Sequence, residues 1–241
     1  MSALQTPEKS SRRKELRENK IVELYARALL LWDEHRSAVL TGFGVLVAAI
    51  LAIPGYMYYQ QQQQEEANQL LGQILPVYEQ GNYQQALDGT GDARGLKEIA
   101  DDFGGTSAGN LATYYAAHAY YQTDQYDRAL TYFQRYDKEK DFFGASAYAA
   151  QAAIHESRGD FDRAGERYEQ AASHFESDLT TPRYLLRAGQ AYEQAGAFDA
   201  AAQAYRQITE EYPDAQQVQD AEVYLARVQA KQQATQRSSA S

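Results

Sequence analysis

Five residues of the sequence have the spacing of a serine nucleophile. The segment GTSAG at residues 105–109 fits the pattern G-x-S-x-G, which in hydrolases places a serine on a sharp turn after a buried strand. The preceding residues, 100–104, have the sequence ADDFG and do not form an apolar strand. We therefore interpret the segment as a turn and a helix cap, with Ser107 or Asn110 accepting a backbone N–H bond. Hydrolysis at Ser107 is the alternative.

Metal and cofactor chemistry has no matching pattern in the sequence. No H-E-x-x-H motif, no pair of histidines four residues apart and no EF-hand loop is present. The absence of cysteine excludes disulfides, thiolate catalysis and zinc–cysteine sites. We therefore expect no catalytic residue, no metal and no cofactor, and a protein that is not an enzyme. The four histidines are scattered along the chain at His35, His118, His155 and His174.

An uncharged segment near the N-terminus predicts one transmembrane helix. Residues 37–59, SAVLTGFGVLVAAILAIPGYMYY, contain no charged side chain. At a rise of about 1.5 Å per residue this helix is roughly 34 Å long, enough for a hydrocarbon core of about 30 Å. Arg36 precedes the segment and three tyrosines end it, which is typical of the polar and aromatic flanks of a membrane span. We expect contact with the lipid bilayer through these residues.

The distribution of charge predicts the orientation of that helix. Residues 1–36 contain eight Lys and Arg, whereas the first basic residue after the span is Arg94. Because basic flanks stay in the cytoplasm, we expect a cytoplasmic N-terminus and a C-terminal domain on the outer side of the membrane. A cleaved signal peptide is the alternative, but the leading segment is long and no A-x-A site precedes Gln60.

The segments that flank the span have simple predicted roles. Met1–Lys9 is expected to be disordered, and residues 11–34 form a basic amphipathic helix. This helix either lies on the inner leaflet or docks on a membrane partner, and both possibilities stay open. Residues 60–66 are expected to be a helical, glutamine-rich stalk, and residues 229–241 a disordered tail. Residues 60–241 carry 15 basic and 27 acidic side chains, a net charge of −12 that argues against a nucleic-acid partner.

A repeated pattern organises the rest of the chain: an aromatic residue, two residues, alanine, three residues, and a second aromatic. Short turns, two of them with glycine, precede the copies. The small alanine permits close approach of helices, and the aromatic residues fill the space on the same face. Such helix pairs bury a continuous core only when they stack. The three full copies are Tyr126, Ala129 and Phe133; Phe161, Ala164 and Tyr168; and Phe198, Ala201 and Tyr205.

These residues and their spacing resemble the tetratricopeptide repeat, which has a period of about 34 residues. The resemblance implies an all-α fold, a tetratricopeptide-repeat α-solenoid over residues 67–228 preceded by one transmembrane helix. The first unit departs from the pattern, because Pro76 lies inside its first helix and Thr90 stands where an aromatic residue belongs; residues 96–103 are expected to complete it as a short helix. The predicted units lie near residues 67–104, 110–143, 145–178 and 182–215.

One membrane span followed by a small array of these repeats resembles the YfgM-like ancillary subunits of the SecYEG translocon. The resemblance implies a single-pass protein of the bacterial inner membrane with a periplasmic repeat domain. Its implied partners are the translocon, periplasmic chaperones or exported chains. A structural assembly factor for an envelope or cell-division complex is the alternative. The oligomeric state stays open.

The resemblance also implies a binding groove, because the first helix of each unit lines the concave face of such solenoids. Aromatic residues in an exposed groove are typical anchors for partner segments. The alternative is that some of these tyrosines belong to the core. The lysine–asparagine clamp of tetratricopeptide co-chaperones is not visible. The predicted groove residues are Tyr114, His118 and Tyr121 of the second unit, Ala149, Ala153 and Glu156 of the third, and Leu186, Gln190 and Glu193 of the fourth.

Overall fold

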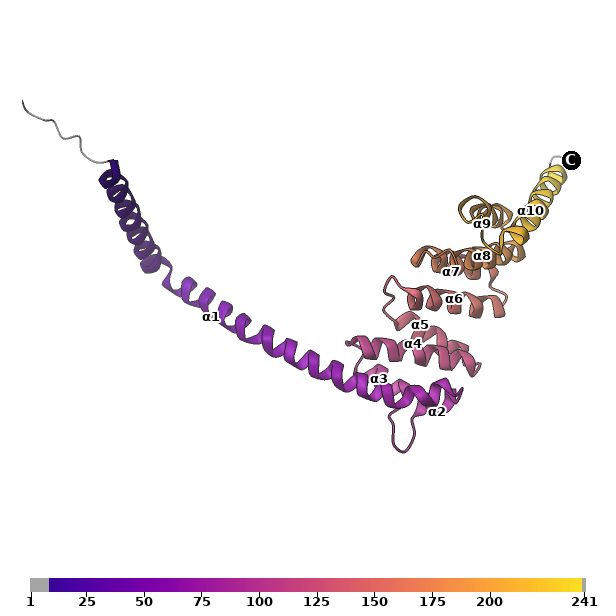
Figure 1. Cartoon of the computed structure of the whole chain (residues 1–241), viewed down its shortest axis with the longest axis horizontal. Coiled ribbons are helices and arrows are strands. Elements are labelled where there is room, and N and C mark those ends of the chain that lie inside the picture. Colours follow the sequence, from indigo (N-terminus) through magenta and orange to yellow (C-terminus); the bar gives the residue numbers. More distant parts are fainter. Residues whose placement is uncertain (1–8, 240–241) are drawn as a thin grey trace, which may run out of the picture. The chain divides into compact units, whose positions relative to one another are not determined.

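The computed structural model describes residues 9–239, and all the regular elements in this range are helices (Figure 1). The predicted disorder of Met1–Lys9 is wrong for Lys9, which begins the first helix, and residues 1–8 lie outside the described residues. The helices are α1 (Lys9–Glu79), α2 (Tyr83–Asp88), α3 (Leu96–Asp102), α4 (Ser107–Gln122), α5 (Tyr126–Arg135), α6 (Phe142–Ser157), α7 (Phe161–His174), α8 (Thr181–Ala195), α9 (Phe198–Glu211) and α10 (Val218–Ser239).

The chain divides into two units, Met1–Gln60 and Gln61–Ser241. In the first unit α1 contains the uncharged segment, and its large apolar side chains are exposed, Phe43 at 65% and Leu51 at 71%. Within the described residues, Leu40–Glu79 is the one helical segment long and apolar enough to span a membrane, with a mean hydropathy of 1.9 over 18 residues. Length and composition alone carry this result, and a signal sequence meets the same criteria. The backbone of residues 11–34 is helical, but the side chains that would form its amphipathic face lie outside the described set.

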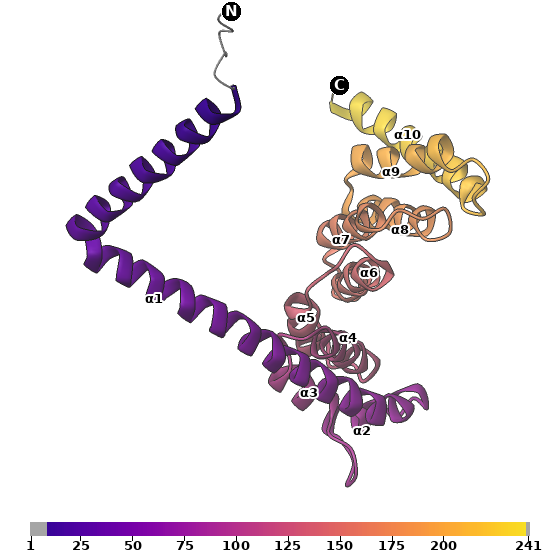
Figure 2. The same ribbon diagram turned by 60° about the vertical axis from the view of Figure 1, so that its left-hand side comes forward.

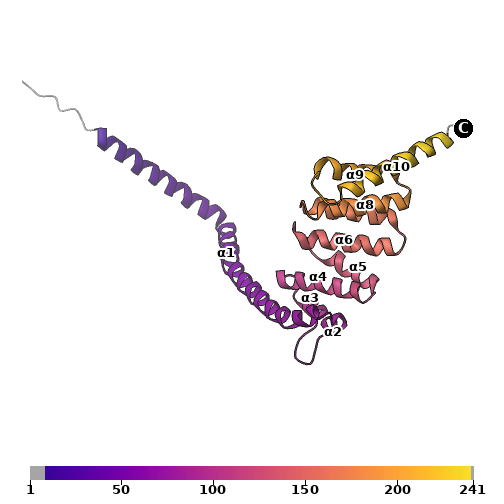
Figure 3. The same ribbon diagram turned by 45° about the vertical axis from the view of Figure 1, so that its right-hand side comes forward.

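The second unit is a stack of antiparallel helix pairs. The pairs α4–α5, α6–α7 and α8–α9 follow one another, and Figure 3 shows α4, α6 and α8 as successive layers. The turns inside the pairs need one residue with positive φ, which glycine adopts without strain. Gly159 and Gly196 fill that position in two pairs, whereas Asp124, at φ +57°, adopts the same left-handed conformation between α4 and α5. The turn geometry is therefore kept although the glycine is absent.

The first helix pair is irregular. Its first helix is the C-terminal part of α1, which continues through Pro76 to Glu79, and its second helix, α2, has only six residues. The chain then turns through residues 89–95, where the Thr90 hydroxyl accepts a bond from the Ala93 N–H at 3.0 Å. Helix α3 follows and buries Leu96 and Ile99, so a short helix completes this pair as expected.

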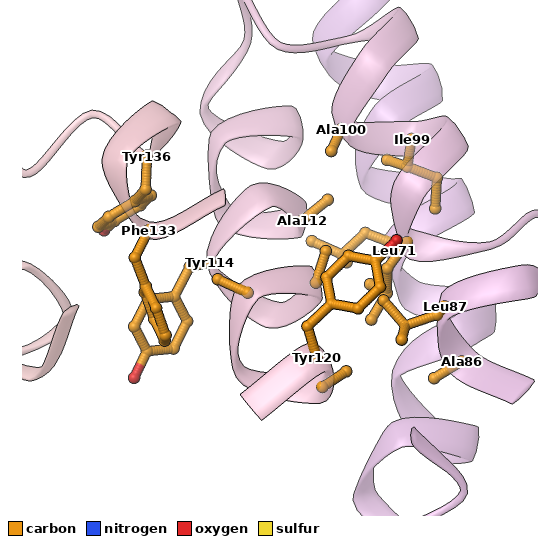
Figure 4. Packing of buried hydrophobic residues seen from close by; sticks show 14 of the residues in the cluster. Leu71, Ala86, Leu87, Ile99, Ala100, Ala112, Tyr114, Tyr120, Phe133 and Tyr136 are labelled. Atoms are coloured by element: carbon orange, nitrogen blue, oxygen red, sulfur yellow. The ribbon is translucent and has the colours of Figure 1, made fainter. Parts of the chain in front are cut away.

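The core of the stack forms two clusters of buried side chains. The first extends from the end of α1 to α5, and Figure 4 shows Leu71, Leu87 and Tyr120 meeting in it between these helices. The second extends from α7 to α10. Helix α6 contributes to both clusters, with Ala147 and Ile154 in the first and Ala152 in the second. Helix α6 is therefore the element that joins the two halves of the core.

The predicted disordered tail at residues 229–241 is wrong for residues 229–239, which continue α10 (Figure 2); residues 240–241 lie outside the described residues. The buried residues Ala221 and Val228 pack against the second core cluster. Beyond them, Lys231 contacts Glu193 of α8 and Gln232 donates to Asp199 of α9. The end of α10 was predicted from the last apolar residue of its pattern, near Val228. The polar contacts of Lys231 and Gln232 stabilise the helix beyond that point.

The close approach of α8 and α9 generates a stability prediction. A Cβ atom added at Gly189 would overlap the ring of Tyr205, which is fully buried, whereas Gly72 of α1 has open space around it. Overpacking outweighs the gain in helix propensity, so Gly189→Ala should destabilise the domain by about 1–2 kcal/mol. Gly72→Ala is the matched control and should leave stability unchanged or raise it slightly. Urea unfolding followed by circular dichroism measures both, and equal midpoints for the two variants would contradict the packing described here.

Candidate functional site

The first helix of each regular pair presents a half-exposed stripe of side chains. On α4 the stripe contains Leu111, Tyr115, His118 and Tyr121, which recur at steps of three and four residues. Ala149 and Ala153 of α6 and Leu186 and Gln190 of α8 are also half-exposed, at equivalent places in the next two pairs. These residues form a surface accessible to a partner, and we call it the groove stripe.

Tyr114 is a core residue, which corrects its prediction as part of the groove. Its side chain is only 7% exposed, and its hydroxyl donates to Ser146 of α6 at 2.9 Å. Its ring packs edge-on against Phe143 at 5.1 Å between centroids and lies beside Phe133 and Tyr136 (Figure 4). Its neighbour Tyr115 occupies the groove stripe instead. The sequence could have indicated this, because Tyr115 is four residues from Leu111 and three from His118, the spacing of residues on one face of a helix.

An aromatic cluster surrounds His118 at the N-terminal end of the groove stripe. The hydroxyl of Tyr78 lies 2.7 Å from Nδ1 of His118, and Gln122 lies 3.1 Å from Nε2. The rings of Tyr83 and Tyr121 lie 6.1 and 6.4 Å from the imidazole. Burial lowers the pKa of His118 below its ordinary value of 6.5 and raises the pKa of Tyr78. Both shifts favour the neutral forms of His118 and Tyr78 at pH 7.

The middle of the stripe is made of small residues. Ala149 and Ala153 of α6 are half-exposed, and Ala149 lines a cavity. Glu156, predicted here as a groove residue, accepts a hydrogen bond from the Tyr168 hydroxyl at 2.9 Å, and Arg187 lies 3.8 Å away. The carboxylate of Glu156 therefore already has two partners within the domain, Tyr168 and Arg187. It does not offer a free negative charge to a protein bound in the groove.

The C-terminal end of the stripe contains a cavity of about 460 Å³. Leu186 and Gln190, both predicted groove residues, line it together with Ala149. The sequence reasoning missed five further side chains of its lining, Gln217 of the turn before α10 and four from α7 and α8. The four are Tyr168, Arg183, Tyr184 and Arg187.

Glu193 is not available to a partner, which corrects the last predicted groove residue. Its side chain is 9% exposed and contacts Arg227 at 2.5 Å and Lys231 at 2.9 Å, both from α10. Burial alone would raise the pKa of Glu193, but the hydrogen bonds from Arg227 and Lys231 outweigh it and hold the pKa below its usual value. The groove therefore ends near Gln190, because α10 covers the next turn of α8.

A second cavity, of about 470 Å³, lies on the side of the second helices α7 and α9. Glu166, Glu169 and Glu176 line it, and Glu169 accepts a bond from the Tyr192 hydroxyl at 2.9 Å. Among the residues that the structure describes, no group of three or more His, Asp or Glu side chains is placed to hold a metal ion.

Two family models match the chain. One, described as a tetratricopeptide repeat-like domain, covers residues 31–141, and the other, described as a tetratricopeptide repeat, covers residues 183–215. This chain carries tetratricopeptide repeats. Repeats of this kind indicate protein partners. No curated protein matches the chain.

The G-x-S-x-G segment is the junction between the first and second tetratricopeptide repeats. The helix cap of α4 is Thr106, rather than Ser107 or Asn110: its hydroxyl oxygen accepts from the Gly109 N–H at 3.0 Å. A side chain at Gly109 would overlap the carbonyl of Phe103, so the tight turn requires glycine there. Asn110 instead bonds both backbone groups of Asp137. The G-x-S-x-G segment therefore forms a turn and the first residues of α4, as we interpreted it from the sequence.

The Tyr78–His118 contact of these tetratricopeptide repeats generates a prediction about pH. Because the pKa of His118 is lowered only in the folded state, the unfolded chain binds more protons below about pH 6.5, and stability falls as the pH falls from 7.5 to 5.5. His118→Gln should make this loss smaller; the remaining part includes His155, whose pKa burial also lowers. Urea unfolding at both pH values measures the effect. An unchanged pH dependence in His118→Gln would contradict it.

Two matched variants separate the hydrogen bond from the ring packing. Tyr78→Phe removes the hydroxyl at 2.7 Å from His118 and should cost about 1 kcal/mol at pH 7.5. Tyr121→Phe keeps the ring in the same cluster and should leave the free energy of unfolding nearly unchanged.

Proposed function

We propose that this chain is a non-enzymatic, membrane-anchored protein–protein interaction module of the bacterial cell envelope. The observation that supports it most is the groove stripe, which crosses successive tetratricopeptide repeats and ends in a cavity of about 460 Å³. Aromatic anchors at one end and a floor of alanines suit the binding of a protein segment, because an extended or helical peptide needs pockets in a row.

The uncharged segment 37–59 is the proposed anchor in the inner membrane. Eight basic residues within residues 1–36 would keep that segment in the cytoplasm, and the domain from residue 60 onward would face the periplasm. The exposed apolar side chains of α1 support this assignment, because a surface of this kind is unfavourable in water.

The proposed role is that of an ancillary translocon subunit or a component of the periplasmic chaperone network. Its partners would be the translocon, periplasmic chaperones or exported chains, bound in the groove stripe. The second candidate is a scaffold for the assembly of an envelope or cell-division complex through the same surface. Both candidates use the same fold and differ in the partner that the groove selects.

The orientation has a direct test in spheroplasts that contain the chain with an epitope at each end. Trypsin added outside should remove the C-terminal epitope and leave the N-terminal epitope protected, because the basic residues from Arg94 onward would be accessible. A cytoplasmic protein assayed in parallel reports that the spheroplasts are intact. A C-terminal epitope that resists trypsin until lysis would overturn the periplasmic placement, while the fold would stand.

Site-specific photocrosslinking tests the groove and separates the two candidate roles. A benzoylphenylalanine at Tyr121 or Ala153 should form adducts with secretion or folding factors, since both positions are half-exposed on the groove stripe. Adducts with division or envelope-assembly proteins would favour the scaffold role. The matched control is Thr131, an exposed position on the second helix α5, where no specific adduct is expected. Equal adducts from all three positions would contradict binding in the groove.

A further inference from the structure

The cavity at the C-terminal end of the groove stripe combines an apolar floor with a positive rim. Ala149, Leu186 and the rings of Tyr168 and Tyr184 supply the apolar surface. Arg183 and Arg187, four residues apart on α8, supply the charge, and this spacing places both guanidinium groups on the same side of the helix.

One of these two arginines, Arg187, has an acidic partner in the structure, and the other has none. Within residues 9–239, Arg183 forms no ion pair and no hydrogen bond. The nearest carboxylate oxygen to Arg187 belongs to Glu156 and lies 3.8 Å away, which is beyond hydrogen-bond distance. The other oxygen of Glu156 accepts from the Tyr168 hydroxyl. Among the described residues, no carboxylate therefore forms an ion pair with both arginines.

The two arginines lie in a domain that is acidic overall. Residues 60–241 carry 27 acidic and 15 basic side chains, so carboxylates are abundant. Two like charges four residues apart on a helix repel each other, and here the described residues supply one carboxylate, Glu156, to Arg187 and none to Arg183. Outside the cavity, Arg128 and Arg167 donate to glutamine side chains. Five other arginines contact Asp or Glu more closely than Arg187 contacts Glu156: Arg94, Arg135, Arg158, Arg163 and Arg227.

We propose that this cavity binds an acidic segment of a partner protein, with an Asp or Glu carboxylate between Arg183 and Arg187 and an adjoining apolar side chain over Ala149 and Leu186. The assignment rests on the proposed function, because it names the chemistry of the partner in the same groove. Guanidinium groups bind carboxylates through paired, charge-assisted hydrogen bonds. The surrounding negative charge of the domain repels acidic chains in general, so the site selects segments that also present the apolar side chain.

A displayed library of random twelve-residue peptides, selected against the full chain in mild detergent, tests the proposal. Selected peptides should be enriched in Asp or Glu next to Leu, Ile or Phe. A selected peptide is then synthesised with a fluorophore, and its affinity is measured by anisotropy. Arg183→Gln with Arg187→Gln should weaken its binding at least tenfold, and replacing the peptide's acidic residue by its amide should cause a similar loss.

The matched control removes the same charge outside the cavity. Lys140 and Arg206 are exposed and line none of the cavities described above, so Lys140→Gln with Arg206→Gln should change the affinity less than twofold. Circular dichroism should show the same helicity in both double variants. Equal losses in the two double variants, or selected peptides without acidic residues, would overturn this assignment while the groove would still bind proteins. A selection that yields no binding peptide would overturn the interaction module as well.

Discussion

The close approach of neighbouring helices is the constraint on which the rest of the domain depends. Where α7 meets α8, the ring of Tyr192 lies over Gly165, and a Cβ there would be only 2.5 Å from the ring. The ring of Tyr205 covers Gly189 in the same way where α8 meets α9. A small residue beneath an aromatic ring lets each helix pair pack on the next without a void, and stacking of this kind is what gives a repeat array its core.

This packing also determines the charge of the groove. The rings that fill the helix interfaces are tyrosines, so their hydroxyl groups end near the carboxylates of the preceding helix. Tyr168 donates to Glu156 and Tyr192 donates to Glu169, both at 2.9 Å. The bond from Tyr168 engages one oxygen of Glu156, and the other oxygen lies 3.8 Å from Arg187 of α8. Arg187 thus keeps a long ion pair with Glu156, and both Arg183 and Arg187 are exposed on the surface of an acidic domain.

The helix pairs were predictable from the sequence because the interface residues recur, whereas contacts between distant segments were not. The aromatic and alanine spacing indicated α4 to α9, and even Asp124 keeps the turn in place of glycine. The alignment of the repeats placed Tyr114 in the groove. Consecutive residues of a helix point about 100° apart, so an error of one position exchanges a core residue for a surface residue. Tyr115, the next residue, is the one on the groove stripe. The capping of α4 by Thr106 was not predictable either, because it depends on the turn at residues 103–106, and the G-x-S-x-G pattern does not specify that turn.

The end of the array shows why the last element was the hardest to predict. A stack of repeats needs a terminal helix with a polar outer face, and α10 supplies it. The sequence of α10 after Val228 has no apolar periodicity, so ionic contacts stabilise that part of the helix. Lys231 and the preceding Arg227 both donate to Glu193 of α8, which is more than thirty residues away in the sequence. The same contact closes the groove beyond Gln190. The helix that caps the fold therefore also limits the groove stripe, which ends at the cavity with the two arginines.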